Sequence, residues 1–388
     1  MIQLNKPKIY QESIDNVSNV LRSGWTGLGA VVTEFEEAVK AYLDTPYAIA
    51  TNSGTAALQL ALTFLNKAQY GSYVITTPNT FISTNHSILH AGLLPVFADI
   101  ELDTGNIDCK SIQKLLDDPF IKRRTRGIIA VHYGGQPVDM DQLYDIANNY
   151  NIDVIEDAAH AFGASYKNDK IGCKYSRLVA FSFHAVKPLS IGDGGLLTTN
   201  DSLVDTEARK LRWCGINKST AERTGADGYK WDYDVEYAGF KSHMNNIQAA
   251  IGMGQLIYID KDAKERQEMV DLYRSLLKDI PQITLLRAHE DRVSSNHLFV
   301  IRCENKDTKY KLMAYLSEHG IQTGCHYRPS HLYRLYSKYE SDNGCPNAVR
   351  FFEEAISLPL HLELTKEDVM YVCEKTEDFF KGKGSKIY

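Results

Sequence analysis

The sequence has few cysteines, and none of them are paired at short spacing. Seven cysteines are scattered over 388 residues, and no Cys-x-x-Cys pair occurs. An odd number of cysteines without such pairs indicates neither a disulfide framework nor a zinc site. We therefore expect reduced cysteines and no bound metal.

Long apolar segments are also missing. No run approaches the roughly 20 apolar residues that a membrane helix requires. The segment 1–7 lacks the apolar core of a signal peptide. We expect a soluble, cytoplasmic protein that has no membrane partner.

The sequence shows no strong charge bias, internal repeat or low-complexity stretch. Its formal net charge is −6, and no basic run or basic aromatic stripe indicates a nucleic-acid partner. An anionic substrate must therefore meet local positive groups, because the overall field does not attract it. With 44% hydrophobic residues, the chain can bury a sizeable core.

Short strand-like segments alternate with helical segments through the first two thirds of the chain. Strands are expected at 47–50, 73–76, 95–100, 127–131, 153–156, 178–181 and 196–199, and helices at 8–22, 33–43, 56–62, 82–91 and 140–150. Thr33 and Glu36 have the spacing of a capping box at the start of the second helix. This alternation predicts an α/β fold, a mostly parallel sheet with helices on both faces.

The remainder of the chain has a different pattern, typical of a smaller α+β domain. Helices are expected at 247–256, 261–278, 307–319, 346–356 and 365–380, with strands at 282–286 and 297–302. A polar stretch, 218–234, is expected to be a surface or interface loop. We expect a large domain over 1–260 and a small domain over 261–388.

Polar or aromatic residues follow several of the expected strands. They are Thr55, Phe81, His132, Asp157 and Lys187. Sites in open α/β sheets lie beyond the carboxyl ends of the strands, so these residues are expected to converge. Lys187 stands between an aromatic run, 181–183, and a glycine cluster, 192–195. A desolvated lysine is a nucleophile for carbonyl groups, whereas the alternative is an ordinary lysine that reaches water at a strand end.

The segment 51–55 passes from a strand through small residues into a helix. Such a turn presents free backbone N–H groups and the positive end of a helix dipole, which suits a phosphate. A simple helix cap by Ser53 or Thr55 is the alternative. Together with Asp157 and Lys187, this turn supplies the parts needed to hold pyridoxal 5′-phosphate. Phe81, Ser182 and His160 are further candidates for contacts with it, although each also fits a structural role.

A series of motifs runs in order from nearly one end of the chain to the other. They are 24–27 with 35–36, 52–58, 80–81, 131–137 with 139–140, 156–161, 182–184 with Lys187, 192–195, 247–252 with 255–256, and 326–327 with Pro329 and His331. In these motifs the chain resembles the sugar aminotransferases of the DegT/DnrJ/EryC1/StrS type, which have the aspartate aminotransferase-like fold (fold type I of the pyridoxal phosphate enzymes).

The resemblance implies a role for each candidate residue. Lys187 would be the catalytic Schiff-base lysine, Asp157 would hold the pyridine nitrogen and Phe81 the ring face. The phosphate would be held by Ser53, Gly54, Thr55, Ala56 and Ser182, and His160 would lie near the cofactor. The family works as a homodimer with shared active sites, and the loop 239–244 would reach the partner's site. The substrate would be contacted by Trp25, Thr26, His184, His243, His326 and Tyr327.

The sequence departs from the family pattern in the loop 239–244. Relatives often carry Gly-x-Asn-x-Arg there, whereas this chain has Lys241 and His243. Lys241 is a candidate for the phosphate contact, and His243 for a substrate contact. Asp193 stands where Glu is common. Relatives that dehydrate sugars replace the lysine with His, and the presence of Lys187 argues against that branch.

The resemblance implies transfer of an amino group from L-glutamate to the keto carbon of a nucleotide-linked keto-deoxysugar, giving an amino sugar for polysaccharide biosynthesis. We expect C4 as the acceptor carbon. The alternatives are a C3-specific aminotransferase, a pyridoxal phosphate-dependent dehydratase or lyase, and a binding protein without catalysis. Arg212 and Arg328 are candidates for the sugar diphosphate, or for ordinary salt bridges.

Overall fold

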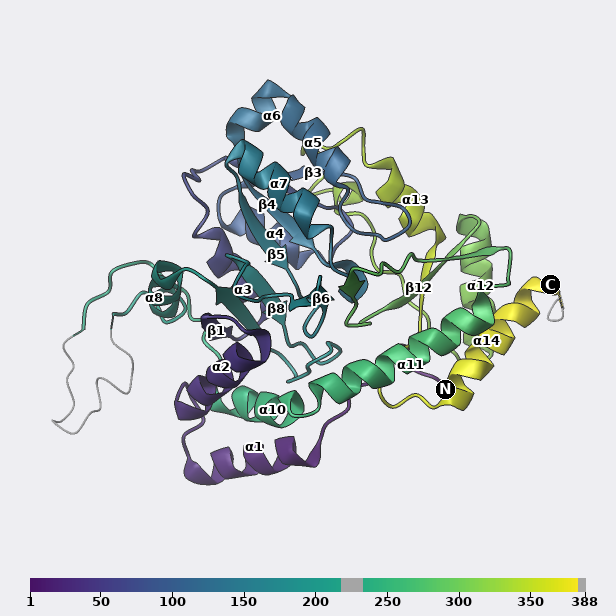
Figure 1. Ribbon diagram of the computed structural model, residues 1–388, viewed down its shortest axis with the longest axis horizontal. Helices are drawn as coiled ribbons and strands as arrows, with labels where there is room; N and C mark the ends of the chain where they lie inside the picture. The colour runs from purple at the N-terminus through teal and green to yellow at the C-terminus, as the bar shows by residue number, and fades with distance from the viewer. Residues whose placement is uncertain (218–232, 383–388) are drawn as a thin grey trace.

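A seven-stranded sheet forms the centre of the protein (Figure 1). The computed structural model describes residues 1–217 and 233–382, and none of their helices is long and apolar enough to cross a membrane. The strand order is β1-β9-β8-β5-β4-β2-β3. The strands are β1 (Tyr47–Thr51), β2 (Tyr73–Thr76), β3 (Leu94–Phe97), β4 (Thr125–Val131), β5 (Asp153–Asp157), β8 (Val179–Ser182) and β9 (Gly195–Thr199). All are parallel except β9, which pairs antiparallel with β1 and β8, so the predicted mostly parallel sheet is confirmed.

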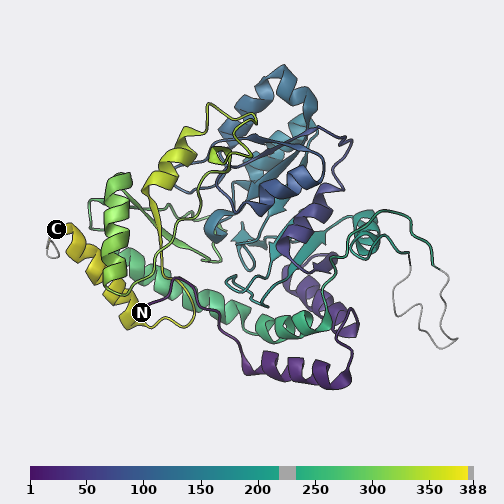
Figure 2. The same ribbon diagram turned by 180° about the vertical axis from the view of Figure 1, so that it is seen from behind.

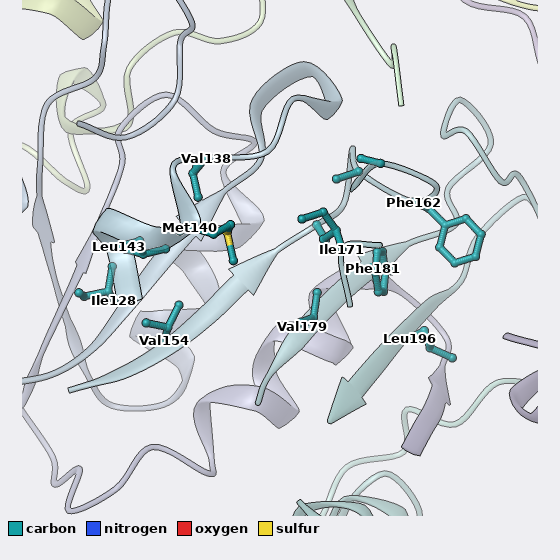
Figure 3. Close-up of a cluster of buried hydrophobic side chains, with 14 of the residues drawn as sticks. Ile128, Val138, Met140, Leu143, Val154, Phe162, Ile171, Val179, Phe181 and Leu196 are labelled. Carbon is teal, nitrogen blue, oxygen red and sulfur yellow. The ribbon is translucent and has the colours of Figure 1, made fainter. Parts of the chain in front are cut away.

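Helices cover both faces of this sheet. Successive residues of a strand point to opposite faces, so Ile128 belongs to one apolar cluster and Ile129 to another. The first face packs against α2 (Ala30–Leu43), α5 (Cys109–Asp117), α7 (Met140–Tyr150) and α10 (Asn246–Leu256). The second packs against α3 (Gly54–Leu62), α4 (Ser83–His90) and α8 (Ser202–Leu211). Figure 3 shows Ile128, Val154 and Val179 side by side on the first face.

The C-terminal part of the chain builds a second, smaller layer. An antiparallel sheet of β10 (Ile283–Leu285), β12 (Phe299–Cys303) and β13 (Ala355–Leu358) packs with α11 (Ile259–Leu277), α12 (Lys306–Glu318) and α14 (Lys366–Phe380). The helix α13 (Pro346–Glu354) packs instead in a cluster that also contains Phe97 and Tyr133 of the larger part. The proposed boundary at 260/261 falls in the first turn of α11, which runs between the two parts (Figure 2).

The N-terminal segment lies across both parts. Ile2 forms a parallel bridge with Ile321, and α1 (Gln11–Ser23) then packs along α10. The short elements that complete the described fold are α6 (Pro119–Arg124), β6 (Ser165–Tyr166), β7 (Asp169–Lys170) and β11 (Arg292–Val293), with 3-10 turns at Tyr133–Gly135 and Ser330–Leu332. Of the predicted polar loop 218–234, residues 218–232 lie outside the described residues.

Two local predictions are wrong. Thr33 does not begin a helix, because α2 starts at Ala30 after an extended Gly29. Glu36 accepts a hydrogen bond from the Ala50 amide (2.8 Å) rather than closing a capping box. Residues 355–356 are not helical, because Ala355–Leu358 pairs antiparallel with β12. An apolar run of that length fits either structure, and the neighbouring strand decides.

Candidate active site

A cavity of about 340 Å³ opens where β4, β5 and β8 end. Segments far apart in the sequence meet in it. The predicted site residues that line it are Ser53, Gly54, Thr55, Phe81, Asp157, His160, Ser182, His184, Lys187, His326 and Tyr327. The expected convergence at the carboxyl ends of the strands is therefore observed for most of the predicted residues.

Lys187 lies in this cavity on the loop that joins β8 to β9. The loop is held by backbone hydrogen bonds from Lys187 N–H to the His184 carbonyl (2.9 Å) and from Ile191 N–H to the Phe183 carbonyl (3.0 Å). Burial lowers the pKa of Lys187 to about 8, and the negative charge of Asp157 partly opposes that shift. The amine is therefore desolvated, unlike that of a lysine reaching into water, and its neutral form is accessible near neutral pH.

Asp157 is the last residue of β5 and faces the same cavity. Its Oδ2 accepts from Thr84 Oγ1 (2.7 Å) and its Oδ1 from the Ala159 amide (3.1 Å). Burial raises the pKa of this carboxyl, while those hydrogen bonds and Lys187 act in the opposite direction. A cation placed against Asp157 would lower that pKa further and hold the carboxylate ionised.

His160 links the cavity wall to Tyr327. The Gly134 amide donates to His160 Nδ1 (3.2 Å), so Nδ1 is an acceptor and the ring proton belongs on Nε2. Burial lowers the pKa of His160 well below its usual value, which keeps the ring neutral. Nε2–H then donates to the Tyr327 hydroxyl oxygen (3.2 Å). The Tyr327 proton is therefore free to be donated to a molecule in the cavity.

The start of α3 forms a tight turn beside Ser182. Ser53 Oγ accepts from the Ala56 amide (3.1 Å), so the predicted helix cap by Ser53 is observed. The Gly54 and Thr55 amides belong to the first turn, where the helix offers no acceptor. A Cβ on Gly54 would lie 2.7 Å from Ser182 Cβ, so only glycine fits there. The cap and an anion site can coexist, because the Ala56 N–H donates to Ser53 while the N–H groups of Gly54 and Thr55 stay available to a ligand.

Five predicted site residues do not line this cavity within one chain. Ala56 is buried behind the turn, and Trp25 and Thr26 are exposed. Lys241 Nζ lies 3.4 Å from the centroid of the Trp213 ring, and the His243 ring packs edge-on against the same ring. Asn246 Nδ2 donates to the Trp25 carbonyl (2.8 Å), which connects the loops 24–27 and 239–246.

The two arginine candidates have different surroundings. Arg212 is buried, pairs with Glu36 (2.5 Å) and donates to the Ala50 carbonyl (2.7 Å). Arg212 therefore forms the salt bridge that was the alternative for it, although a buried one, and it does not line the cavity that contains Lys187. Arg328 is exposed beside Tyr327 and donates to the Leu332 carbonyl (3.2 Å), which leaves most of its guanidinium to solvent.

The sequence interpretation gave no role to three residues that shape the site, Thr80, Thr84 and Gly134. Thr84 fixes the Asp157 carboxylate, and Thr80 Oγ1 lies 2.8 Å from Thr84 Oγ1. The available signal was the spacing of four residues between the two threonines, with Thr84 in the first turn of α4 and Thr80 just before that helix. Gly134 orients His160 from a left-handed conformation (φ 64°). It stands in a Gly-Gly pair after a strand, a pattern of a shaped turn.

The fold and the cavity define a class of enzyme, the sugar aminotransferases of fold type I. The structure matches that of the putative sugar aminotransferase Spr1654 from Streptococcus pneumoniae in its PLP form with a TM-score of 0.88. The two chains are 30% identical, and the match covers 98% of this chain and 99% of the other. The predicted fold class is confirmed.

The chain belongs to the DegT/DnrJ/EryC1/StrS aminotransferase family, whose model matches residues 7–377. It is 37% identical to the spore coat polysaccharide biosynthesis protein SpsC of Bacillus subtilis, over 97% of this chain and 96% of that protein. It is 34% identical to the UDP-4-amino-4-deoxy-L-arabinose–oxoglutarate aminotransferase of Shewanella sediminis, over 98% and 99%. The protein is an aminotransferase, and the family resemblance is confirmed.

Proposed function

We propose that this protein carries pyridoxal phosphate and transfers an amino group from L-glutamate to C4 of a nucleotide-linked keto-deoxysugar. The observation that carries the proposal is the desolvated Lys187, which shares a cavity with Asp157 and with the first turn of α3. The Shewanella relative is named for a UDP-linked 4-amino sugar and for oxoglutarate, which supports both the carbon and the donor.

The residues in the cavity fit this cofactor. The N–H groups at the start of α3 and the Ser182 hydroxyl suit its phosphate, and the glycine at position 54 keeps that turn free of side chains. Burial raises the pKa of Asp157, and the positive charge of Lys187 partly opposes that shift. A protonated ring nitrogen would add a further positive charge beside this carboxylate. Phe81 is 58% exposed on the cavity wall, which leaves its ring free to pack against the cofactor.

Lys187 is the proton carrier in the proposed reaction. Pyridoxal phosphate, when bound, supplies an aldehyde that condenses with amines and a protonated ring that withdraws electrons. The pKa of the Lys187 amine, about 8, lies close to neutral pH. The amine can therefore accept a proton from the Cα of the amino donor and donate it to a neighbouring atom. In the second half of the proposed reaction, the same amine would donate a proton to C4 of the sugar.

Other residues would bind and orient the acceptor. Tyr327 presents a hydroxyl proton to the cavity, and His184 and His326 line its wall. The positive charge of Arg328 lies next to Tyr327 and suits the sugar diphosphate. The exposed Trp25 is available to a nucleotide as a stacking surface.

A second copy of the chain would complete each site. Lys241 and His243 lie outside the cavity of their own chain, on a loop joined by Asn246 to the exposed segment 24–27. In the proposed homodimer, these residues reach the cavity of the partner subunit. Lys241 would then contribute a positive charge to the phosphate, and His243, with a pKa lowered to about 4 by burial, a neutral ring to the substrate.

Absorbance and amino transfer test the proposal together. Protein saturated with pyridoxal phosphate should show a visible absorbance band that Lys187→Ala lacks, and L-glutamate should convert the wild type with release of 2-oxoglutarate. Wild-type protein that stays colourless after cofactor addition would overturn the cofactor assignment. Loss of colour without 2-oxoglutarate would overturn the donor.

The acceptor carbon needs a separate comparison. Matched 4-keto and 3-keto sugar nucleotides, given to the glutamate-treated enzyme, should yield an amino sugar from the 4-keto compound. Faster turnover of the 3-keto compound would establish the alternative regiochemistry. Sugar consumption without any amino product would identify a dehydratase or lyase.

A further inference from the structure

A second cavity of about 240 Å³ lies between α11 and the loops on either side of β11. Gln267, Val270 and Arg274 line it from one face of α11. Leu298 and Phe299 add apolar surface. This cavity shares no lining residue with the one that contains Lys187.

The ionisable side chains that line this second cavity are all basic. Arg274, Arg292 and His289 line it, and no carboxylate does. Arg292 is already neutralised, since its guanidinium pairs with Asp291 (2.8 Å) and Asp139 (3.7 Å). The excess positive charge of the cavity therefore comes from Arg274.

Arg274 forms no salt bridge with the described residues. Its guanidinium donates to the Leu286 carbonyl (2.7 Å), and among the described residues no carboxylate lies within 4 Å of it. Burial lowers the pKa of Arg274, and Asp271 partly opposes the shift. A half-buried guanidinium that no carboxylate of the described residues contacts directly favours an anionic ligand.

Two further polar atoms in the same cavity lack a partner. Gln136 Nε2 and His289 Nε2 are buried and make no hydrogen bond with any residue in 1–217 or 233–382. A buried donor that stays unpaired costs free energy, and a bound ligand would recover it. The amide nitrogen of Gln136 can only donate, so it suits a carboxylate or phosphate oxygen.

We infer that this second cavity is a binding site for a small organic anion, whose carboxylate or phosphate group is held by Arg274 and Gln136 and whose carbon skeleton packs on Val270 and Phe299. The site adjoins the active site through Gly134, which lines the second cavity while its amide holds His160. The inference does not depend on the cofactor, because no cofactor-binding residue takes part in it.

Calorimetric titration of the full chain tests this site with two probes, inorganic phosphate and succinate, each exchanged against chloride at constant ionic strength. The wild type should bind at least one probe, and Arg274→Gln should weaken binding by about tenfold or more. Arg287→Gln is the matched control, because Arg287 is exposed and lies outside the cavity. Whichever probe binds more tightly shows whether the site prefers phosphate or carboxylate.

Two variants separate this site from the active site. Inorganic phosphate can also occupy the turn at the start of α3, so binding that is lost in Ser182→Ala belongs to the active site. Binding in the second cavity should stay intact in this variant, since Ser182 does not line that cavity. Gln136→Met removes the amide donor and keeps a side chain of similar length, so it should also weaken binding. This variant tests the site even if Arg274→Gln fails to fold. Absence of binding by both probes, or binding lost in Ser182→Ala and kept in Arg274→Gln and Gln136→Met, would overturn the inference.

Discussion

Burial sets the chemistry of individual residues in the Lys187 cavity. It lowers the pKa values of Lys187 and His160 and raises that of Asp157. Each of these shifts favours the neutral form of the side chain, because burial makes the charged form less stable. A ligand that places an opposite charge beside one of these groups would stabilise its charged form.

Lys187→Met should stabilise the cofactor-free protein by about 3 kcal/mol near neutral pH. The folded-state pKa is lowered from 10.5 to about 8, so the unfolded state binds the proton more tightly. The cost of burying the charged amine is therefore fully present below pH 8. This cost disappears as the pH rises toward 10.5, and the stabilisation by Lys187→Met should disappear over the same range. Urea unfolding of both proteins between pH 7 and about 10.5 measures the difference in free energy of unfolding.

Lys309 provides the matched control for that measurement. It is fully buried, but its Nζ donates to the Phe352 carbonyl and lies 4.6 Å from the Phe352 ring centroid. Lys309→Met should therefore destabilise the protein, because it leaves that carbonyl without its donor. Equal stabilisation by both substitutions would contradict the special environment of Lys187.

Tyr327→Phe should destabilise the protein by about 1–3 kcal/mol, because it leaves the buried Nε2–H of His160 without an acceptor. It should also weaken binding of the sugar nucleotide, which loses a donor in the cavity. Tyr333→Phe, at a partly exposed ring outside the cavity, should change the free energy of unfolding by less than about 0.5 kcal/mol. An unchanged stability of Tyr327→Phe would argue against the assigned His160 tautomer.

At the scale of elements, the turn between β1 and α3 depends on close packing against β8 and β9. A Cβ on Gly195 would lie 2.3 Å from the Ser53 carbonyl oxygen, and one on Gly54 would lie 2.7 Å from Ser182 Cβ. The N-terminus of α3 is thereby pressed against the end of β8. A phosphate at this position can meet both the helix N–H groups and the Ser182 hydroxyl.

Gly54→Ala should lower the affinity for pyridoxal phosphate by about tenfold or more, because the added methyl group pushes α3 away from Ser182. Absorbance titration with the cofactor measures the dissociation constant. Gly27→Ala serves as the control for cofactor binding, since nothing lies within 4 Å of a Cβ at that position. Unchanged affinity in Gly54→Ala would place the phosphate elsewhere.

A buried ion-pair network joins α2, β1 and α8. Glu36 pairs with Arg212 (2.5 Å) and Arg209 (2.7 Å), and it accepts from the Ala50 amide (2.8 Å). Burial opposes ionisation of Glu36, but the two arginines outweigh it and lower the pKa of this carboxyl. The network therefore fixes strand β1, from which the chain enters α3.

Glu36→Gln should destabilise the protein by about 3–5 kcal/mol at neutral pH, because it leaves two arginines near an uncharged amide. The pKa of Glu36 is lowered on folding, so its contribution is fully present above the unfolded value of 4.5. The contribution is lost as the pH falls through the folded value, and the difference between variant and wild type should shrink in acid. Glu37→Gln, in an exposed pair with Lys40, should cost about 0.5 kcal/mol or less.

At the scale of the whole molecule, the proposed dimer requires that each active site draw on two chains. Lys187→Ala and a Lys241→Ala, His243→Ala double variant should each have greatly reduced activity alone. Mixed and reassociated, they should regain activity, because a hybrid dimer contains one site with all three residues. Recovery that fails although hybrid dimers form would show that Lys241 and His243 serve their own chain or only the fold.

The alternation of apolar segments made the sheet predictable, because a buried parallel strand and an amphipathic helix have different periods. The same signal failed for Ala355–Leu358, whose four residues suit helix or strand until β12 pairs with them. It also failed for Glu36, whose spacing from Thr33 matched a capping box while its partners lay in α8 and β1. Contacts with residues that are distant in the sequence cannot be predicted from the local pattern.

The sequence by itself determined the class of fold and the residues that end its strands, since local periodicity and turn residues are properties of neighbouring positions. Lys187, Asp157 and the 53–55 turn could therefore be named from it. Only the tertiary structure decided which ring nitrogen of His160 carries the proton, that Arg212 pairs with Glu36, and that Arg274 lines a second cavity where no carboxylate of the described residues contacts it. Desolvation and hydrogen-bond partners depend on what packs around a group, and that is settled by contacts across the whole chain.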